Sequence, residues 1–352
     1  MKLARDFRRT SILTSFLISS LLMTLLMTLP LRAEQPSSRT LDSGWQFRAV
    51  ANTIPAGNAD AASFASANLA DWHPAQVPGV VQTDLLQNKI IPDPFDRDNE
   101  YRLQWIGLTD WEYQTVFQVD AAALAREHVD LVFDGLDTFA DVYLNDQSIL
   151  HSDNMFRQWR APAKAQPKQG PNTLRIVFHS AIEKMIPYVK SLPYMLPSIS
   201  THNAGNEEDI PTAPYTRKAP YHYGWDWGPR FMTEGIWRPV RIESWDAIRI
   251  ENFHIHQQKV SAEAALITAE LDIEASRPLT TTLALGHNIG GANSSASAPE
   301  KQTSDGTQTV QLDVGMNHVS FPVRVASPQL WYPVGYGAQN RYQFSEIGRA
   351  HV

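Results

Sequence analysis

The chain has 352 residues, of which 43% are hydrophobic and 19% charged, and this composition excludes a disordered or fibrous protein. Its length predicts about two domains, and the absence of cysteine excludes disulfides, so stability must come from core packing. The formal net charge is −7, and because residues 1–33 carry five basic side chains and one acidic one, the remainder has a net charge of −11. Such an acidic chain is a poor candidate for binding nucleic acid or anionic lipid, whereas a neutral substrate suits it.

Residues 1–33 have the pattern of a secretory signal peptide. A basic start is followed by the apolar run 11–30, and Ala33 supplies a small residue at the end. We expect cleavage after Ala33 and export to the periplasm or the extracellular medium, with no membrane attachment afterwards. The alternative is an uncleaved membrane anchor, because the apolar run is nearly long enough to span a bilayer.

From Thr40 onward the dominant sequence period is two, which is typical of β-strands. Apolar or alternating runs bounded by turn residues predict strands at 113–119, 129–136, 140–146, 172–180 and 237–245. The stretch LNDQSILH (144–151) predicts a hairpin. A helical pattern is found only at 121–128 and 182–192, and Pro187 is expected to interrupt the second. Many short strands with turns between them predict an all-β sandwich for residues 34–246.

A second set of strands begins after the predicted domain boundary at Asp246 and Ala247. Its members are predicted at 248–256, 265–275, 280–286, 307–314 and 318–327. Their spacing suits an immunoglobulin-like sandwich for residues 247–344. The small, polar segment 290–308 is expected to be a flexible loop, and Asn293 in it begins a formal glycosylation acceptor.

The stretch APYHYGWDWGPR (219–230) places Asp226 between Trp225 and Trp227 in a segment that favours neither helix nor strand. It ends a long, proline-rich irregular segment (191–229), and such segments in compact domains are usually functional or disordered. An exposed indole can stack on a pyranose, and an ionised carboxylate can accept hydrogen bonds from two adjacent hydroxyls. The alternative is a turn capped by Asp226 with both tryptophans packed inside, and the residues alone leave both interpretations open.

Three other groups of polar residues are weaker candidates. The acidic segment 92–102 lacks the glycine and spacing of a calcium loop, so we expect surface salt bridges there. Three aspartates, Asp134, Asp137 and Asp141, lie so close to apolar strand residues that we expect them to cap turns and pair with arginines. His254 and His256 share a strand face, but no third ligand is placed by the sequence, and a polar strand face explains them. We therefore expect no metal site.

Seven blocks, read in order, resemble β-mannosidases of glycoside hydrolase family 2. They are SGWQFRAV, WHPAQVPGVVQTDLL, IPDPFDRDNEYRLQWIG, WEYQTVF, FDGLDTFADVYLND, YHYGWDWGPRFMTEGIWRPV and QLWYPVGYGAQN. The resemblance extends from about Leu41 to Phe344. The WDWGP block is the most specific, because it separates the mannosidase branch from the β-galactosidases and β-glucuronidases of the family.

The resemblance implies a jelly-roll-like, galactose-binding-like sandwich, an immunoglobulin-like sandwich and then a (β/α)8 barrel, which this chain does not contain. It implies an exo-acting, retaining enzyme that removes terminal non-reducing β-D-mannose from oligosaccharides, without a cofactor. Trp225 and Asp226 would then bind the terminal mannose. The family's acid/base and nucleophile glutamates lie on barrel strands, so no catalytic residue is assigned in this chain and we expect it to be inactive alone. The alternative is a non-catalytic, mannoside-binding protein of two sandwiches, and the chain-length preference, the aglycone and the oligomeric state stay open.

The last residues, SEIGRAHV (345–352), do not continue the resemblance. EIGRAHV can be encoded by a DNA string that contains a widely used sequencing-library adapter. We therefore expect residues 345–352 to be a non-native tail and the immunoglobulin-like sandwich to be truncated. The alternative is a natural short C-terminus.

Overall fold

The computed structural model of the chain describes residues 36–56, 58–64, 69–197, 210–290 and 303–350. The predicted signal peptide and Asn293 therefore lie outside the described residues. The chain divides into two compact units, one of Pro36–Asp246 and one from Ala247 onward. Among the helices of the described ranges, none is long and apolar enough to cross a membrane.

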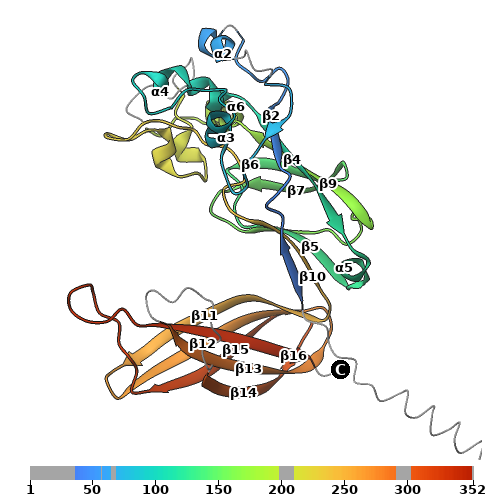
Figure 1. The fold of residues 1–352 in the computed structure, drawn as a ribbon, viewed down its shortest axis with the longest axis vertical. Helices are drawn as coiled ribbons and strands as arrows, with labels where there is room; N and C mark the ends of the chain where they lie inside the picture. Colours follow the sequence, from blue (N-terminus) through green and yellow to red (C-terminus); the bar gives the residue numbers. More distant parts are fainter. Residues whose placement is uncertain (1–35, 57, 65–68, 198–209, 291–302, 351–352) are drawn as a thin grey trace, which may run out of the picture. The chain divides into compact units, whose positions relative to one another are not determined.

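The first unit is a sandwich of two antiparallel sheets (Figure 1). The four-stranded sheet has the order β1 (Ser37–Thr40), β10 (Val240–Trp245), β5 (His128–Phe133), β8 (Trp159–Pro162). The six-stranded sheet has the order β3 (His73–Pro74), β2 (Gln46–Ala49), β4 (Trp111–Val119), β9 (Gly170–His179), β6 (Phe139–Leu144), β7 (Gln147–Asp153). These strands confirm the predicted all-β sandwich.

Alternation of buried and more exposed residues along β9 and from Tyr113 onward in β4 explains why these segments are strands. Trp111 and Tyr113 are fully buried in β4 while Val116 is 59% exposed, and Phe178 of β9 meets Tyr113 edge-on at 5.7 Å. Burying each such side chain contributes about 1.5–3 kcal/mol, so the register that places them inside is strongly favoured. The predicted hairpin is confirmed between β6 and β7, where Asn145 and Asp146 have φ of 49° and 65°, as a tight two-residue turn requires.

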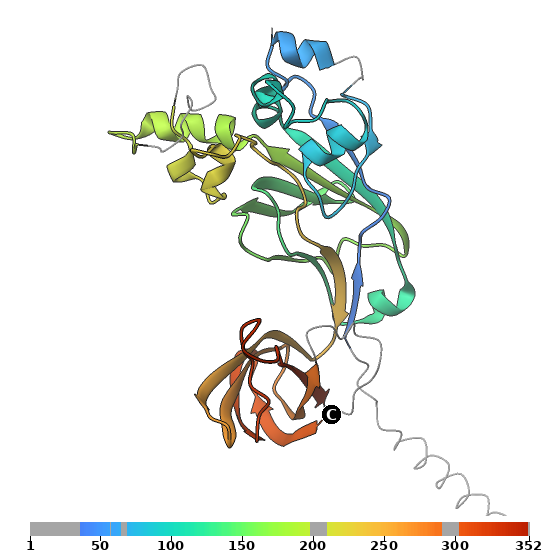
Figure 2. The ribbon, with the colours of Figure 1, turned by 60° about the vertical axis from the view of Figure 1, so that its left-hand side comes forward.

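Most helices and irregular segments of this unit gather at one end of the sandwich, whereas α5 (Ala121–Ala125) lies near the other end beside β5, as Figures 1 and 2 both show. The helices of the unit are α2 (Ala59–Phe64), α3 (Val81–Gln87), α4 (Asn99–Arg102), η1 (Gln104–Leu108), α5 (Ala121–Ala125), α6 (Ala181–Ser191), η2 (Ala213–Tyr215) and η3 (Pro220–Tyr223). The expectation that Pro187 interrupts α6 is wrong, because the helix continues through it. Ile182 and Val189 are buried on either side of Pro187, and this tertiary packing outweighs the lost backbone bond.

The second unit consists of two three-stranded antiparallel sheets. Their orders are β11 (Ile248–Val260), β12 (Ala264–Ala275), β15 (Gly315–Ala326) and β14 (Thr303–Leu312), β13 (Leu279–Gly290), β16 (Arg341–Ala350). A separate core of buried apolar residues, among them Leu271, Ile273 and Leu283, lies between the sheets. The five predicted strands are all present.

Two boundaries of this unit differ from the expectations. Residues 303–308 belong to β14 and pair with β13, so the predicted loop 290–308 is too long. Only the first residues of this strand, 303–306, were missed, because β14 has almost no buried side chain and a polar edge strand shows no apolar alternation. β16 pairs with β13 as far as Ala350 and so includes residues 345–350. That residues 345–352 are a non-native tail stays a prediction.

Candidate functional site

The Trp-Asp-Trp sequence forms a tight turn at the end of the sandwich where the helices gather. Gly224 follows the last residue of η3 and has a φ of +100°, a conformation that favours glycine. The backbone N–H groups of Trp225 and Gly228 then donate to each other's carbonyl oxygens, both at 3.3 Å. Asp226 and Trp227 are therefore the two tip residues of a short hairpin-like loop.

The tip presents an aromatic surface and a carboxylate to solvent. Trp227 is 83% exposed, Asp226 is exposed, and Trp225 is half-buried. The indoles of Trp225 and Trp227 meet edge-on, with centroids 5.9 Å apart and planes at 80°. The Asp226 carboxylate makes no hydrogen bond or ion pair with any described residue. The alternative in which both tryptophans pack inside is wrong for Trp227, and the arrangement can offer a stacking face next to a hydrogen-bond acceptor.

The segment 92–104 braces the C-terminal side of this loop. The Arg230 N–H donates to Glu100 Oε1 at 2.7 Å, and Gln104 Nε2 donates to the Arg230 carbonyl at 2.9 Å. Phe95 packs edge-on against Phe231 with centroids 5.3 Å apart. Part of the segment predicted to form surface salt bridges therefore holds the backbone of the site. Sequence reasoning missed Glu100, because its partner is a backbone group 130 positions away.

A buried polar cluster lies at the base of the loop. Lys218 and Asp137 form an ion pair whose side chains are 0% and 1% exposed, and Thr233 contacts both. Burial lowers the pKa of Lys218. Burial and the Lys218 ammonium lower the pKa of His222 to about 4, so this imidazole is neutral at neutral pH. Burial also raises the pKa of Glu234 well above its usual range, which favours its neutral form.

The three aspartates that were predicted to cap turns and pair with arginines, Asp134, Asp137 and Asp141, have different partners. Asp134 pairs with Arg241, as expected for an aspartate beside an apolar strand. Asp141 differs, because its carboxylate lies 2.6 Å from His151 Nδ1 and 3.0 Å from His179 Nε2. Asp137 differs too, since its partner is Lys218.

His254 and His256 share a face of β11, as predicted, with ring centroids 4.3 Å apart. The Nε2 atom of His256 lies 2.9 Å from Glu270 Oε2 on the neighbouring strand β12. In the parts of the chain that the structure describes, no group of three or more His, Asp or Glu residues is arranged to hold a metal ion.

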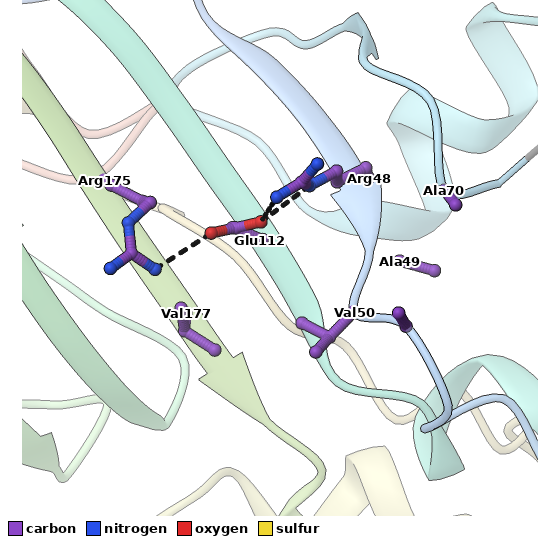
Figure 3. Close-up of a pocket in the computed structure, with 8 residues that line it drawn as sticks. Arg48, Ala49, Val50, Ala70, Glu112, Arg175 and Val177 are labelled. Atoms are coloured by element: carbon purple, nitrogen blue, oxygen red, sulfur yellow. Dashed lines mark hydrogen bonds and ion pairs between the residues drawn. The ribbon is translucent and has the colours of Figure 1, made fainter.

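A depression of about 320 Å³ lies on the outer face of β2, β4 and β9 and shares no residue with the loop (Figure 3). Glu112 lies between two arginines there, 2.6 Å from Arg48 Nη2 and 2.9 Å from Arg175 Nη1 (Figure 3). Both carboxylate oxygens are thus occupied and the rest of the lining is small and apolar. We therefore place the candidate site at the loop 219–230, where the Asp226 carboxylate makes no polar contact with any described residue.

Comparison with known proteins agrees with this fold. Residues 45–238 match the family model "Glycosyl hydrolase 2 galactose-binding domain-like", and residues 248–345 match "Glycosyl hydrolases family 2". Beta-mannosidase B of Thermothelomyces thermophilus is 33% identical over 271 residues, which are 76% of this chain and 29% of that protein. Beta-mannosidase B of Aspergillus clavatus is 36% identical over 282 residues, which are 78% of this chain and 30% of that protein. The chain thus spans less than a third of the length of these relatives.

Solved structures show the same likeness. The crystal structure of a beta-D-mannosidase from Dictyoglomus thermophilum superposes with a TM-score of 0.72 at 30% identity, over 90% of this chain and 35% of that one. The exo-chitosanase CsxA of Amycolatopsis orientalis, at 19% identity and a TM-score of 0.58 over 89% of this chain and 34% of that one, shares the fold. The chain therefore belongs to glycoside hydrolase family 2, with a galactose-binding-like sandwich followed by an immunoglobulin-like one.

Proposed function

We propose that this chain is the N-terminal part of an exported β-mannosidase. The full-length enzyme would remove terminal non-reducing β-D-mannose from oligosaccharides, with retention of configuration at the anomeric carbon. The observation that carries the proposal is the exposed tip of the loop, where Asp226 lies between two tryptophans and its carboxylate makes no polar contact with any residue that the structure describes. Membership of glycoside hydrolase family 2 and relatives named beta-mannosidase B support the sugar assigned to it.

In this proposal Trp225 and Asp226 bind the terminal mannose together. The indole face excludes water from the apolar face of the pyranose, and the carboxylate accepts hydrogen bonds from two adjacent hydroxyls. Both groups are held on a loop that is braced at Arg230. The site orients a sugar but contains no acid/base pair, so we expect the 352-residue chain to bind a mannoside without hydrolysing it.

Calorimetric titration of the chain with β-1,4-linked mannobiose tests the binding site. Asp226→Asn removes the charge at the tip and should weaken binding about tenfold or more, as expected for loss of a charge-assisted hydrogen bond. Asp146→Asn is the matched control, because Asp146 is also an exposed turn aspartate, with φ of 65°, which asparagine tolerates. Equal mannobiose affinity in the Asp226→Asn variant and the wild type would refute the site.

Two further measurements separate the parts of the proposal. Cellobiose differs from mannobiose in its configuration at C2, so tighter binding of cellobiose would contradict a mannoside site. Amplifying and sequencing the source DNA beyond codon 344 tests the enzyme. A frame that encodes a barrel with two glutamates supports the β-mannosidase, whereas a stop after Val352 favours a non-catalytic mannoside-binding protein.

Export rests on the sequence of residues 1–33 alone. We expect the protein recovered from the periplasm or the medium to begin at Glu34. N-terminal sequencing measures this directly, and a cytoplasmic protein that begins at Met1 would contradict it.

A further inference from the structure

The loop that presents Trp225 and Asp226 is closed at its base by buried polar groups. We propose that Asp137, Lys218 and Thr233 form a clamp that holds this loop in its ligand-binding conformation. The inference rests on the proposed function for its ligand, but the clamp itself can be tested without any ligand. It assigns a positioning role to three residues that do not reach the sugar.

The contacts connect both ends of the loop to one aspartate. Lys218 Nζ, at the N-terminal end, donates to Asp137 Oδ1 and, at 2.6 Å, to the carbonyl oxygen of Thr233. The Thr233 hydroxyl, at the C-terminal end, donates to Asp137 Oδ2 at 2.7 Å and lies 3.2 Å from Lys218 Nζ. The ammonium thus bridges the two ends of the segment 218–233, and Asp137 binds both of them.

Asp137 is itself fixed to the sandwich, so it can serve as an anchor. Its N–H donates to the Gly235 carbonyl at 3.0 Å, and the Gly235 N–H donates back at 3.1 Å. The residue precedes β6, a strand of the six-stranded sheet that pairs with β9 on one side and β7 on the other. The clamp therefore ties the loop to a strand that is held on both sides.

Burial of an ion pair at this position calls for an explanation other than stability. Two buried charges of this kind gain little over a well-packed apolar pair, because removing them from water offsets their attraction. A lysine ammonium has three donors, however, and here they fix the loop ends relative to Asp137. Such directional contacts specify one conformation, and a loop ordered in advance does not have to be ordered when the ligand binds.

The tip of the loop has less support than its ends. Tyr223 is buried in a small apolar cluster with Met232, and the Ala219 N–H donates to Met155 Sδ at 3.1 Å. The backbone bonds within the loop are short-range, from His222 to Ala219, from Gly224 to Tyr221 and between Trp225 and Gly228. The brace at Arg230 holds only the C-terminal side. Loosening the clamp should therefore release the tip while the sheets remain folded.

Thr233→Val in the 352-residue chain is the sharpest test. It removes the hydroxyl that donates to Asp137 but keeps the side-chain shape and the Lys218–Asp137 ion pair. Lys218→Met is less suitable, because it would leave a buried aspartate without its counter-charge and unfold the unit. Hydrogen exchange followed by mass spectrometry should show protection of the amides in 219–230 falling about tenfold, the loss expected for one hydrogen bond to a charged group. Amides of β4 and β9 should keep wild-type protection, and the Kd for β-1,4-mannobiose should rise by a similar factor.

Two matched variants complete the design. Thr233→Ser keeps the hydroxyl and should restore both the protection and the affinity. Thr115→Val also removes a buried hydroxyl, which donates to the Ser43 carbonyl at 3.0 Å, but it lies in β4 and should leave residues 219–230 unchanged.

The outcomes separate the clamp from the proposed function. Wild-type protection of 219–230 in Thr233→Val, or an equal loss of protection in β4 and β9, would overturn the clamp. Lost protection with unchanged mannobiose affinity would overturn its role in binding. If the wild-type chain binds no mannoside, the proposed function fails, and the exchange measurement still decides whether the clamp exists.

Discussion

Replacing Asp84 with asparagine should change how the stability of the first unit depends on pH. Asp84 lies in α3 with no exposed surface, and its carboxylate accepts hydrogen bonds from the Tyr113 hydroxyl at 2.7 Å and the Gln76 N–H at 2.8 Å. Burial raises its pKa from 3.8 to about 6, against the opposing effect of these two donors. The asparagine has nearly the same shape and cannot ionise.

The sign and size of the effect follow from the two pKa values. Between pH 3.8 and about 6 the folded state retains a proton that the unfolded state has lost. The free energy of unfolding of the wild type therefore falls as the pH rises through this window, and Asp84→Asn lacks this component. The rise of the pKa from 3.8 to about 6 corresponds to about 3 kcal/mol. The difference in free energy of unfolding between the wild type and Asp84→Asn should therefore change by about that amount between pH 4 and pH 7, in favour of the variant at pH 7.

Urea unfolding at pH 4, 5, 6 and 7, followed by tryptophan fluorescence, measures this difference. The signal reports the first unit, because every tryptophan except Trp331 lies within Pro36–Asp246. Other groups that titrate in this range, such as His222, are present in both proteins and cancel from the difference. A difference that stays constant from pH 4 to pH 7, or one that favours the wild type as the pH rises, would refute the reasoning.

Three further substitutions, two in the first unit and one in the second, test packing. Gly235→Ala should cost about 1–3 kcal/mol, because φ is +145° and the new Cβ would lie 2.9 Å from the Gly79 carbonyl oxygen. Gly170→Ala, also at positive φ but with open space around it, should cost less, so equal urea midpoints for the two variants would contradict a close-approach effect. Leu271→Ala, at a position that is 1% exposed in β12, should destabilise the second unit by about 2–5 kcal/mol. Calorimetry should show one transition shifted, while the fluorescence transition of the first unit and mannobiose binding stay unchanged; a shift of both transitions would argue against independent cores.

The longer strands at 113–119, 129–136, 140–146, 172–180 and 237–245 could be predicted from the sequence because they depend on local periodicity, whereas short strands such as β1, β3 and β8 could not. Alternation along 113–119 and 172–180 marks the face that is buried, and the pair Asn145–Asp146 provides the turn between two strands. The same reasoning failed for the first residues of β14, 303–306, whose side chains are mostly exposed, and for α6, where packing on both sides of Pro187 outweighs the proline.

The sequence also pointed to the candidate site, because Asp226 between two tryptophans is a local motif, but the residues alone left open whether these side chains are exposed. Only the tertiary structure showed that Asp226 and Trp227 are exposed and which residues support the loop. Asp137 and Lys218 are 81 positions apart, and Glu100 reaches the backbone of Arg230 across 130 positions. Each is a single polar contact, which leaves no periodic pattern in the sequence. These groups need partners because they are buried, and they become buried only when the two sheets and the loops at their end pack together.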